Sequence, residues 1–338
     1  MTILENLQMR PATLDDAAAI VELINLCTME EENVTSATVE EQRRGMERPH
    51  FNPATDTVMV FAPDGTLVGY GGVSSRPPHV AMGAWGRVHP DYRGQGIGTR
   101  MLAWTDERAR QFIDQAPPGS RVSLFRNNTR SNVAAEPLLT AHGYTVTRYY
   151  WRMAIELDQE QPTPQWADGI RVRTMVRGQD ERAVYHAAED AFQDHYGFVA
   201  QEEEPGFRDF MHWIEKDPNH DPSLWFLAVT DGDEGEEIAG ISLCTGKMNE
   251  DPDMAYVMEL AVRRPWRRQG IALALLHHSF GEFRRRGKAR ATLHVDAQSL
   301  TGATRLYEKA GMHVDREYEE FSKVLREGEE LSTQTLEE

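Results

Sequence analysis

Two glycine-containing loops carry the residue pattern with the clearest chemical meaning in this sequence. Residues 85–98 read WGRVHPDYRGQGIG, and residues 259–272 read ELAVRRPWRRQGIA. In each, an apolar strand end runs through Arg-x-x-Gly-x-Gly/Ala into a helical pattern. Such a loop directs backbone N–H groups into one concavity at the positive end of a helix, and glycine lets a ligand approach the backbone closely. The pattern therefore predicts two anion-binding sites.

The two loops belong to an internal repeat. When the two motifs are aligned, residue 85 matches residue 259, an offset of 174 positions. A single loop of this kind could simply turn a strand into a helix, but its recurrence at equivalent places favours a ligand site. Neither copy is followed by Gly-Lys-Ser/Thr, and neither fits GxGxxG. Nucleotide hydrolysis and dinucleotide binding are therefore not indicated.

The elements that must position the loops recur in the same order in each half. A strand and one or two helices precede a β-hairpin pattern, at 58–73 and again at 225–243, then the loop strand, the loop helix, a short strand, a helix ending in glycine, and last strands. This order predicts an α+β fold with two similar domains, residues 1–157 and 169–327. The polar, proline-containing segment 158–168 is expected to be a linker, and the acidic segment 328–338 a frayed tail.

Composition limits the classes of partner. The chain has 338 residues and a net charge of −18, from 54 acidic and 36 basic side chains, which disfavours nucleic acid and anionic membranes and favours cationic partners. No apolar run reaches the roughly 18 residues of a membrane helix, and the N-terminus lacks a signal-peptide pattern, so we expect a cytoplasmic protein. The two cysteines, Cys27 and Cys244, are expected in the core, and no metal site is indicated because the histidines show no ligand spacing.

The loop motifs resemble the acyl-CoA-binding signature of the GNAT N-acetyltransferases. The segments VHPDYRGQGIGTRML and VRRPWRRQGIALALL carry that resemblance, and TGATRLYEKAGM looks like the late helix of the family. The resemblance covers nearly the whole chain as a tandem pair, the arrangement of mycothiol synthase. It implies two GNAT-fold domains, each a mixed, mostly antiparallel sheet flanked by helices, and acetyl-CoA as the acyl donor. Nothing in the sequence singles out a thiol-sugar substrate.

The resemblance also implies which residues hold the cofactor. Pantetheine would enter a V-shaped opening beside the loop strand, and the diphosphate would lie on the loop. In the second half the implied residues are Leu260, Ala261, Val262, Arg267, Arg268, Gln269, Gly270, Ile271, Ala272, Leu273 and Ser299. In the first half they are Val88, Arg93, Gly94, Gln95, Gly96, Ile97, Gly98, Thr99 and Asn132. The arginines would supply the local positive charge that an acidic protein needs for an anionic ligand.

Acyl transfer to an amine needs a base for the acceptor, a donor to the carbonyl oxygen and an acid for the departing thiolate. Glu259 lies just before the strand end that family geometry places near the acyl group, so it is the candidate base, with water as an alternative. Tyr307 matches the family tyrosine that approaches the sulfur and is the candidate acid. A backbone N–H of the splayed strand would polarise the carbonyl. Either side chain could instead be structural, as an exposed carboxylate or a core tyrosine.

The first half departs from this catalytic pattern. Leu139 occupies the tyrosine position and Trp85 the position of Glu259, whereas Asn132 keeps the family asparagine that Ser299 or Leu300 replaces in the second half. We therefore predict chemistry in the second half and a binding or scaffolding role in the first. Arg87, where the second half has Ala261, is expected to crowd the first opening.

The acceptor is predicted to be the primary amine of a small molecule. In this family the acceptor pocket comes from the first helices and their loop, here about Asp194 to Asp221, where aromatic residues accompany Glu202, Glu203 and Glu204. Such a mixture suits a cationic amine, although the acidic triplet could equally begin a helix. Two alternatives stay open: a non-catalytic acyl-CoA-binding protein, and transfer of another acyl group or to a hydroxyl acceptor. The oligomeric state is not indicated.

Overall fold

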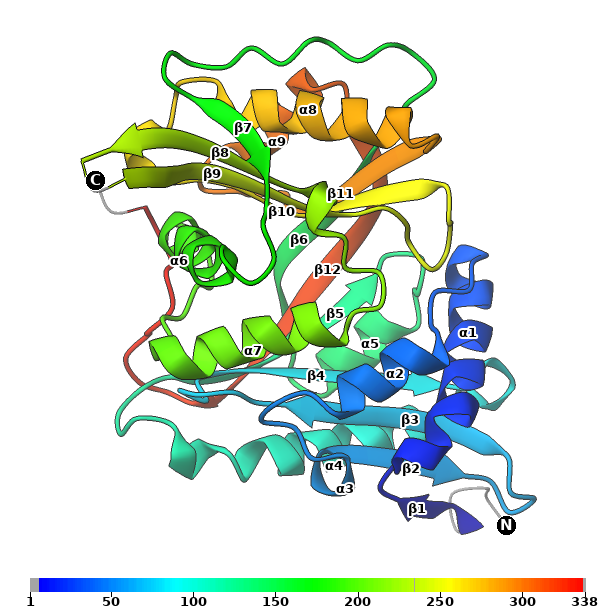
Figure 1. The fold of residues 1–338 in the computed structure, drawn as a ribbon. Coiled ribbons are helices and arrows are strands. Elements are labelled where there is room, and N and C mark those ends of the chain that lie inside the picture. Colours follow the sequence, from blue (N-terminus) through cyan, green and yellow to red (C-terminus); the bar gives the residue numbers. More distant parts are fainter. Residues whose placement is uncertain (1–5, 234, 337–338) are drawn as a thin grey trace. The chain divides into compact units, whose positions relative to one another are not determined.

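The computed structural model describes residues 6–233 and 235–336, and its contacts divide the chain into two compact units (Figure 1). Unit 1 is formed by Met1–Arg148 with Tyr318–Leu331, and unit 2 by Tyr149–Glu317 with Ser332–Glu338. Within the described residues, each unit has one mixed sheet between helices. The α+β architecture expected of each half is confirmed.

Unit 1 has the strand order β1-β2-β3-β4-β5-β12, in which only the β4–β5 pair is parallel. Its strands are β1 (Gln8–Arg10), β2 (Thr57–Phe61), β3 (Leu67–Ser74), β4 (Ala81–Val88), β5 (Val122–Thr129) and the later part of β12 (His313–Arg326). Its helices are α1 (Ala17–Glu32), α2 (Val39–Met46), α3 (Pro53–Asp56), α4 (Ile97–Arg110) and α5 (Ala135–Ala141).

Unit 2 repeats this order as β7-β8-β9-β10-β11-β6, and only its β10–β11 pair is parallel. Its strands are β7 (Arg171–Thr174), β8 (Trp225–Gly232), β9 (Gly235–Thr245), β10 (Met254–Val262), β11 (Arg290–Asp296) and the later part of β6 (Thr145–Glu156). Its helices are α6 (Glu181–Phe192), α7 (Glu203–Lys216), α8 (Ile271–Arg285) and α9 (Ala303–Lys309).

Each central strand is apolar on both faces because helices cover both sides of the sheet. In β8, Trp225 and Leu227 pack in the cluster that contains α6, and the alternating Phe226 and Ala228 pack in the cluster that contains α8. Figure 1 shows α6 and α8 on opposite faces of this sheet. In unit 1 the same alternation separates a cluster under α1 from one under α4. The loop that precedes α4 or α8 is thus anchored between a buried strand and a buried helix.

The compact units divide the chain differently from the sequence repeat. β6 ends the first repeat but pairs with β11 of unit 2, and β12 ends the second repeat but pairs with β5 of unit 1. Each repeat therefore gives its last strand to the other unit. The segment 158–168, predicted as a linker, lies in unit 2, where Trp166 and Ala167 pack against the core.

The acidic C-terminal segment is bonded rather than frayed through residue 333. Glu329 exchanges backbone hydrogen bonds with Gly119 and Arg121 in unit 1, and Thr333 does so with Gly197 and Phe198 in unit 2. Residues 337 and 338 of the predicted tail lie outside the described residues. Backbone pairing thus overrides the negative charge of this segment.

The described residues contain no helix that is long and apolar enough to cross a membrane. They also contain no group of three or more histidine, cysteine, aspartate or glutamate side chains that could hold a metal ion. Cys27 and Cys244 are both buried with free thiols, which confirms their predicted place in the core. The cytoplasmic location stays a prediction.

Candidate active site

A V-shaped opening between β10 and β11 forms the centre of the candidate site in unit 2. The two strands pair in parallel only at Met254, Ala255 and Tyr256, and the remaining length of each runs apart from the other. On the opposite side of β10, the register with β9 shifts between Val257 and Glu259, so Met258 is an extra residue in a β-bulge. Such a bulge bends a strand and redirects the side chains beside it. Glu259 follows directly.

A cavity of about 260 Å³ fills this opening. Glu259 and Tyr307 both line it, together with Ser299. The structure therefore brings the predicted base and the predicted acid to one cavity. The cavity is otherwise lined by Tyr150, Phe192, Asp194, His195, Tyr196, Val257, Met258, Leu260, Leu293, His294, Val295, Asp296, Leu300, Thr301 and Ala303.

Glu259 is a buried carboxyl group with a raised pKa. Its Oε2 atom is buried and has no hydrogen-bond partner among the described residues. Burial, assisted by the negative charge of Glu189, raises the pKa of Glu259 to about 7. Near neutral pH this carboxyl group is therefore divided between its protonated and charged forms, and the charged form can take a proton.

Tyr307 occupies the buried face of the short helix α9. The side chain is 7% exposed, and burial, with a smaller contribution from Tyr256, raises the pKa of Tyr307 to about 12. The phenol therefore keeps its proton throughout the physiological range. The backbone N–H of Met312 donates to the Tyr307 carbonyl at 3.0 Å, which fixes the end of the helix.

His294 is a cavity residue that the sequence did not predict. Desolvation inside the cavity, with the positive charge of Arg152, lowers the pKa of His294 to about 4, so the ring is neutral at pH 7 although part of the residue is exposed to solvent. Its Nδ1 atom lies 3.1 Å from the Tyr256 hydroxyl. A neutral imidazole in the opening can accept or donate a hydrogen bond without adding charge.

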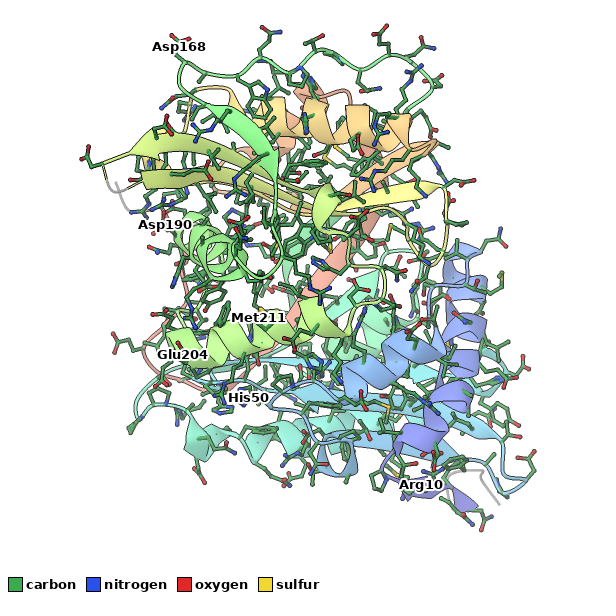
Figure 2. All side chains as sticks on the ribbon, in the orientation of Figure 1. Arg10, His50, Asp168, Asp190, Glu204 and Met211 are labelled. Carbon is green, nitrogen blue, oxygen red and sulfur yellow. The ribbon has the colours of Figure 1, made fainter. Side chains whose placement is uncertain are left out.

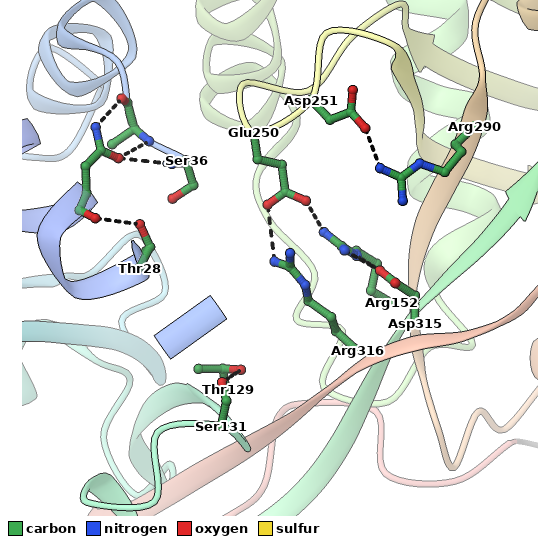
Figure 3. A network of polar contacts seen from close by, with 12 residues as sticks. Thr28, Ser36, Thr129, Ser131, Arg152, Glu250, Asp251, Arg290, Asp315 and Arg316 are labelled. Carbon is green, nitrogen blue, oxygen red and sulfur yellow. Dashed lines mark hydrogen bonds and ion pairs between the residues drawn. The ribbon is translucent and has the colours of Figure 1, made fainter. Parts of the chain in front are cut away.

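Figure 3 shows a buried ion-pair network around Arg152, the β6 residue that pairs with His294 of β11. Arg152 is 3% exposed and pairs with both Glu250 and Asp315. Glu250 also accepts from Arg316 at 3.2 Å. The network holds β6, β12 and the segment before β10 together within unit 2, and its arginines are the charges that disfavour protonation of His294.

The loop before α8 has the geometry of an anion site. Gly270, with φ of 81°, and Arg268, with φ of 64°, adopt left-handed conformations. From Arg268 to Leu273 no backbone N–H donates to a carbonyl within the described chain, and donation resumes with Ala274 to Gly270. These unsatisfied donors at the start of a helix fit the diphosphate of an acyl-CoA.

The loop before α4 reproduces this geometry in unit 1. Gly94 and Gly96, with φ of 74° and 83°, stand at the positions of Arg268 and Gly270. The backbone N–H groups from Gly94 to Thr99 likewise donate to no carbonyl in the described chain, and Arg100 N–H is the first that does. The predicted duplication therefore extends to backbone conformation, although a non-glycine residue takes the left-handed position in the second copy.

The signature arginines bind the protein itself. Arg267 pairs with Asp194 and donates to the carbonyls of Val262 and Ala191. Arg93 pairs with Glu30 and Glu31 and donates to the Val88 carbonyl. Each guanidinium thus ties its loop to the end of the first helix of its half. These two arginines, predicted as cations for the cofactor, position the loop in this structure.

Ser299 begins the turn before α9. The turn Asp296–Ser299–Gly302 repeats the backbone bonds of Thr129–Asn132–Ala135 in unit 1, which places Ser299 rather than Leu300 at the position of Asn132. The Ser299 hydroxyl accepts from the Ala303 N–H at 3.4 Å. The ambiguity of register left by the sequence is thereby resolved.

The opening in unit 1 has a larger cavity and lacks counterparts of Glu259 and Tyr307. β4 and β5 pair only from Ala81 to Gly83 and then part, and a cavity of about 480 Å³ lies between them. β4 pairs with β3 without a register shift, so no bulge occurs there. Trp85 and Leu139 line this cavity, and the Tyr144 N–H bond to the Leu139 carbonyl confirms that Leu139 matches Tyr307.

Only part of the predicted acceptor segment reaches the cavity of unit 2. Asp194 lines it with the two residues that follow. Glu203 and Glu204 instead begin α7, where both pair with Arg182. Figure 2 labels Glu204 on this helix. The acidic triplet is thus a helix start, the alternative that the sequence left open.

Asp194 is the charged residue of this region whose contacts the sequence did not predict. Hydrogen bonds from Arg264 and Arg267 lower the pKa of Asp194 to about 2, so the carboxylate stays charged. An acidic residue near the end of the first helix in both halves, Glu31 and Asp194, was the available signal.

A family model described as the acetyltransferase (GNAT) family matches residues 18–144 and 182–312 of this chain. Curated relatives include the mycothiol acetyltransferase of Thermobispora bispora, 30% identical over 227 residues that make up 66% of this chain and 70% of that protein. The mycothiol acetyltransferase of Streptomyces coelicolor is 28% identical over 250 residues, or 73% of each chain.

Solved structures agree with this assignment. The GCN5-related N-acetyltransferase from Sphaerobacter thermophilus is 37% identical, with a TM-score of 0.78 over 99% of this chain and 100% of that chain. The tandem GNAT protein of the clavulanic acid biosynthesis pathway is 14% identical, with a TM-score of 0.70 over 96% of this chain and 100% of that one. The latter likeness concerns the fold alone and confirms the tandem architecture.

Proposed function

The chain belongs to the acetyltransferase (GNAT) family and is an acetyl-CoA-dependent N-acetyltransferase, and on that premise we propose that unit 2 acetylates the primary amine of a small molecule. Glu259 acts as the base and Tyr307 as the acid. The observation that carries the proposal is the buried, unpartnered carboxylate oxygen of Glu259 in the same cavity as a protonated tyrosine.

Removal of a proton from the acceptor is the first demand on the site. A primary amine has a pKa near 10 and is mostly protonated at pH 7. Glu259, with a pKa of about 7, can take that proton directly or through a water while remaining partly ionised. A strand carboxylate in water, with a pKa near 4.3, would be a weaker base.

The thiolate that leaves needs a proton or a hydrogen bond. Tyr307 remains protonated because its pKa is about 12, and it lines the cavity. Full proton transfer from this phenol to a thiolate would be uphill, so hydrogen bonding is its main contribution. The bulge at Met258 distorts the strand ladder at the point where a backbone N–H would polarise the acetyl carbonyl.

Acetyl-CoA supplies a thioester-activated acetyl group. The N–H groups from Arg268 to Leu273 fit its diphosphate, and the unpaired edge of Leu260, Ala261 and Val262 fits its pantetheine arm. Arg267 holds that loop in place, and Ser299 fixes the turn on the other side of the opening. In unit 1 the corresponding loop and Asn132 support cofactor binding without chemistry, because Trp85 and Leu139 replace the base and acid.

The cavity supports a compact acceptor with a cationic amine. Its volume is about 260 Å³, and Tyr307 is joined in its lining by the aromatic residues Tyr150, Phe192 and Tyr196. Aromatic faces beside a carboxylate attract a cation. The relatives are named mycothiol acetyltransferases, so the mycothiol-type acceptor is one member of the set to be tested. A hydroxyl acceptor or a longer acyl group is the competing possibility.

The proposal is tested by incubating the purified full chain with acetyl-CoA and a panel of primary amines and matched alcohols, and measuring CoA release. We expect release with at least one compact amine and none with its alcohol. Tyr307→Phe should lower turnover about tenfold or more while acetyl-CoA affinity is kept. Turnover with alcohols alone would contradict the amine assignment, and unchanged turnover of Tyr307→Phe would remove the acid role.

A further inference from the structure

A buried ionic cluster lies at the closed end of the opening in unit 1. Arg126 directly follows Phe125, the last β5 residue that pairs with β4. The side chain of Arg126 is 7% exposed and donates to the Thr105 hydroxyl. Its Nη2 atom lies 3.7 Å from Asp106.

The cluster has more positive than negative charge. Asp106 is its one carboxylate among these contacts, and Lys323 pairs with it at 2.6 Å. The Tyr144 hydroxyl also donates to Asp106, at 2.5 Å. Arg126 and Lys323 thus share one carboxylate, which leaves one positive charge in excess. The Nε atom of Arg126 is buried and has no hydrogen-bond partner among the described residues.

The excess charge faces the cavity of unit 1. Arg126 lines that cavity, as do Arg87, Arg93 and the carboxylate of Glu31. Glu31 pairs with Arg93 at 2.9 Å, whereas the buried Nε atom of Arg87, like that of Arg126, has no partner in the described chain. A buried guanidinium N–H without an acceptor is costly, so an anionic ligand group at this end would be stabilising.

Unit 2 has no such cluster at the equivalent positions. Leu293 stands where unit 1 has Arg126, since Leu293 pairs with Met153 as Arg126 pairs with Phe321, and Leu293 carries no charge. Ser279 and Phe280 replace Thr105 and Asp106, and Met312 replaces Tyr144. Ser279 and Phe280 are fully buried. The positive charge is therefore a property of unit 1 and not of the shared fold.

We propose that the opening of unit 1 selects a coenzyme A species that carries a negative charge at its sulfur end. Two sources supply that chemistry: the thiolate of free CoA, and the terminal carboxylate of a dicarboxylic acyl group. This inference rests on the proposed cofactor binding at both loops, because the diphosphate on Gly94–Thr99 directs the sulfur end toward Arg126. Unit 1 thereby discriminates against the uncharged acetyl thioester that unit 2 consumes.

The test is a ligand titration of the full chain with hydrogen exchange read separately in residues 97–102 of unit 1 and 271–276 of unit 2. Acetyl-CoA, free CoA and succinyl-CoA are compared. In unit 1 we expect half-protection at about tenfold lower concentration for CoA or succinyl-CoA than for acetyl-CoA. A preference for CoA identifies the thiolate, and a preference for succinyl-CoA identifies the carboxylate.

Variants assign the preference to the cluster. Arg126→Met removes the charge, leaves Asp106 paired with Lys323 and should abolish the preference in unit 1. Arg126→Lys keeps the charge and should retain it, as should the control Arg130→Met on an exposed arginine of the same unit. Equal protection of unit 1 by all three ligands, a preference that survives in Arg126→Met, or no protection of unit 1 would overturn the inference. The first two results leave acetylation by unit 2 untouched, whereas missing protection and turnover in unit 2 would refute the proposed function itself.

Discussion

At the scale of single residues, the same burial accounts for the proposed role of Glu259 as a base and for its energetic cost. The Oε2 atom lacks a partner, so the charged form loses hydration that nothing in the described chain replaces. That loss raises its pKa to about 7. The site therefore holds a stronger base than a solvated carboxylate, at the expense of folding free energy.

Glu259→Gln is predicted to stabilise unit 2 in a pH-dependent way. The folded pKa lies above the ordinary value of 4.5, so the wild-type folded state binds the proton more tightly and loses stability as pH rises from about 4.5 to 7. At pH 8 the substitution should raise the free energy of unfolding by about 1–2 kcal/mol, since the buried amide keeps a smaller cost. Urea unfolding at pH 8 and pH 4 measures it, and equal gains at both pH values would contradict the burial account.

Sequence identified the residues that belong to a motif and missed those whose role depends on the fold. Glu259 and Tyr307 could be predicted because each stands at a fixed place beside a recognisable segment. His294 could not, because its low pKa comes from desolvation in the cavity and from Arg152, which lies 142 positions earlier in the sequence (294 against 152). Arg267 stays a predicted cofactor ligand, and its ion pair with Asp194 could not be predicted because the motif shows no trace of Asp194.

At the scale of elements, the loops before α4 and α8 are each held to the first helix of their half by an ion pair between an arginine and a carboxylate. Arg267 bonds to Asp194 in unit 2, and Arg93 bonds to Glu31 in unit 1. The ion pairs hold the loop in place, so its backbone N–H groups stay available to bind a ligand. Preorganisation of this kind reduces the entropy lost when a ligand binds.

Asp194→Asn is predicted to loosen the loop before α8. Asp194 receives both Arg264 and Arg267, so the neutral amide should cost about 1–3 kcal/mol of stability and raise the KM for acetyl-CoA several-fold. Asp190→Asn is the control, because Asp190 pairs with Arg263 at 2.6 Å at a more exposed place on α6 (Figure 2). Steady-state kinetics and thermal unfolding measure both variants. An unchanged KM in Asp194→Asn would mean that the arginine does not position the loop.

The order of elements was predictable, but the β-bulge of β10 was not. Alternating apolar residues and Asp-Gly turns locate the hairpins β2–β3 and β8–β9, and glycine marks the helix ends. The bulge is a shift of one residue at Met258, and no residue type there announces it. The two halves therefore looked alike in sequence at the strand where they differ in geometry.

At the scale of the whole molecule, the repeat in sequence and the compact units in space differ by one strand each. β12 pairs with β5 from Tyr318 to Arg326, and β6 pairs with β11 from Tyr150 to Glu156. Sequence similarity records the order of elements along a repeat, but it does not record which unit receives a terminal strand. The boundaries 1–157 and 169–327 thus describe the repeat, and as folding units they stay a prediction.

Two buried residues on the exchanged strands test this division. Phe321 belongs to the second repeat and Met153 to the first, and both are fully buried. Phe321→Ala should destabilise unit 1, and Met153→Ala unit 2, each by about 2–5 kcal/mol. Hydrogen exchange in β4 and β10 reports the two units separately. Loosening of β10 alone by Phe321→Ala would show that each repeat folds with its own last strand.

The central claim is that unit 2 transfers the acetyl group with Glu259 as base, and the pH dependence of kcat/KM for the best amine tests it most directly. A plot of wild-type kcat/KM against pH should show a rising limb that levels off near pH 7, because the charged form of Glu259 appears as pH passes its pKa. Glu259→Gln should lower kcat/KM by about 100-fold and lose that limb while acetyl-CoA affinity is kept, and the control Glu237→Gln on β9 should follow the wild type. A wild-type rate and an unchanged limb in Glu259→Gln would contradict the account.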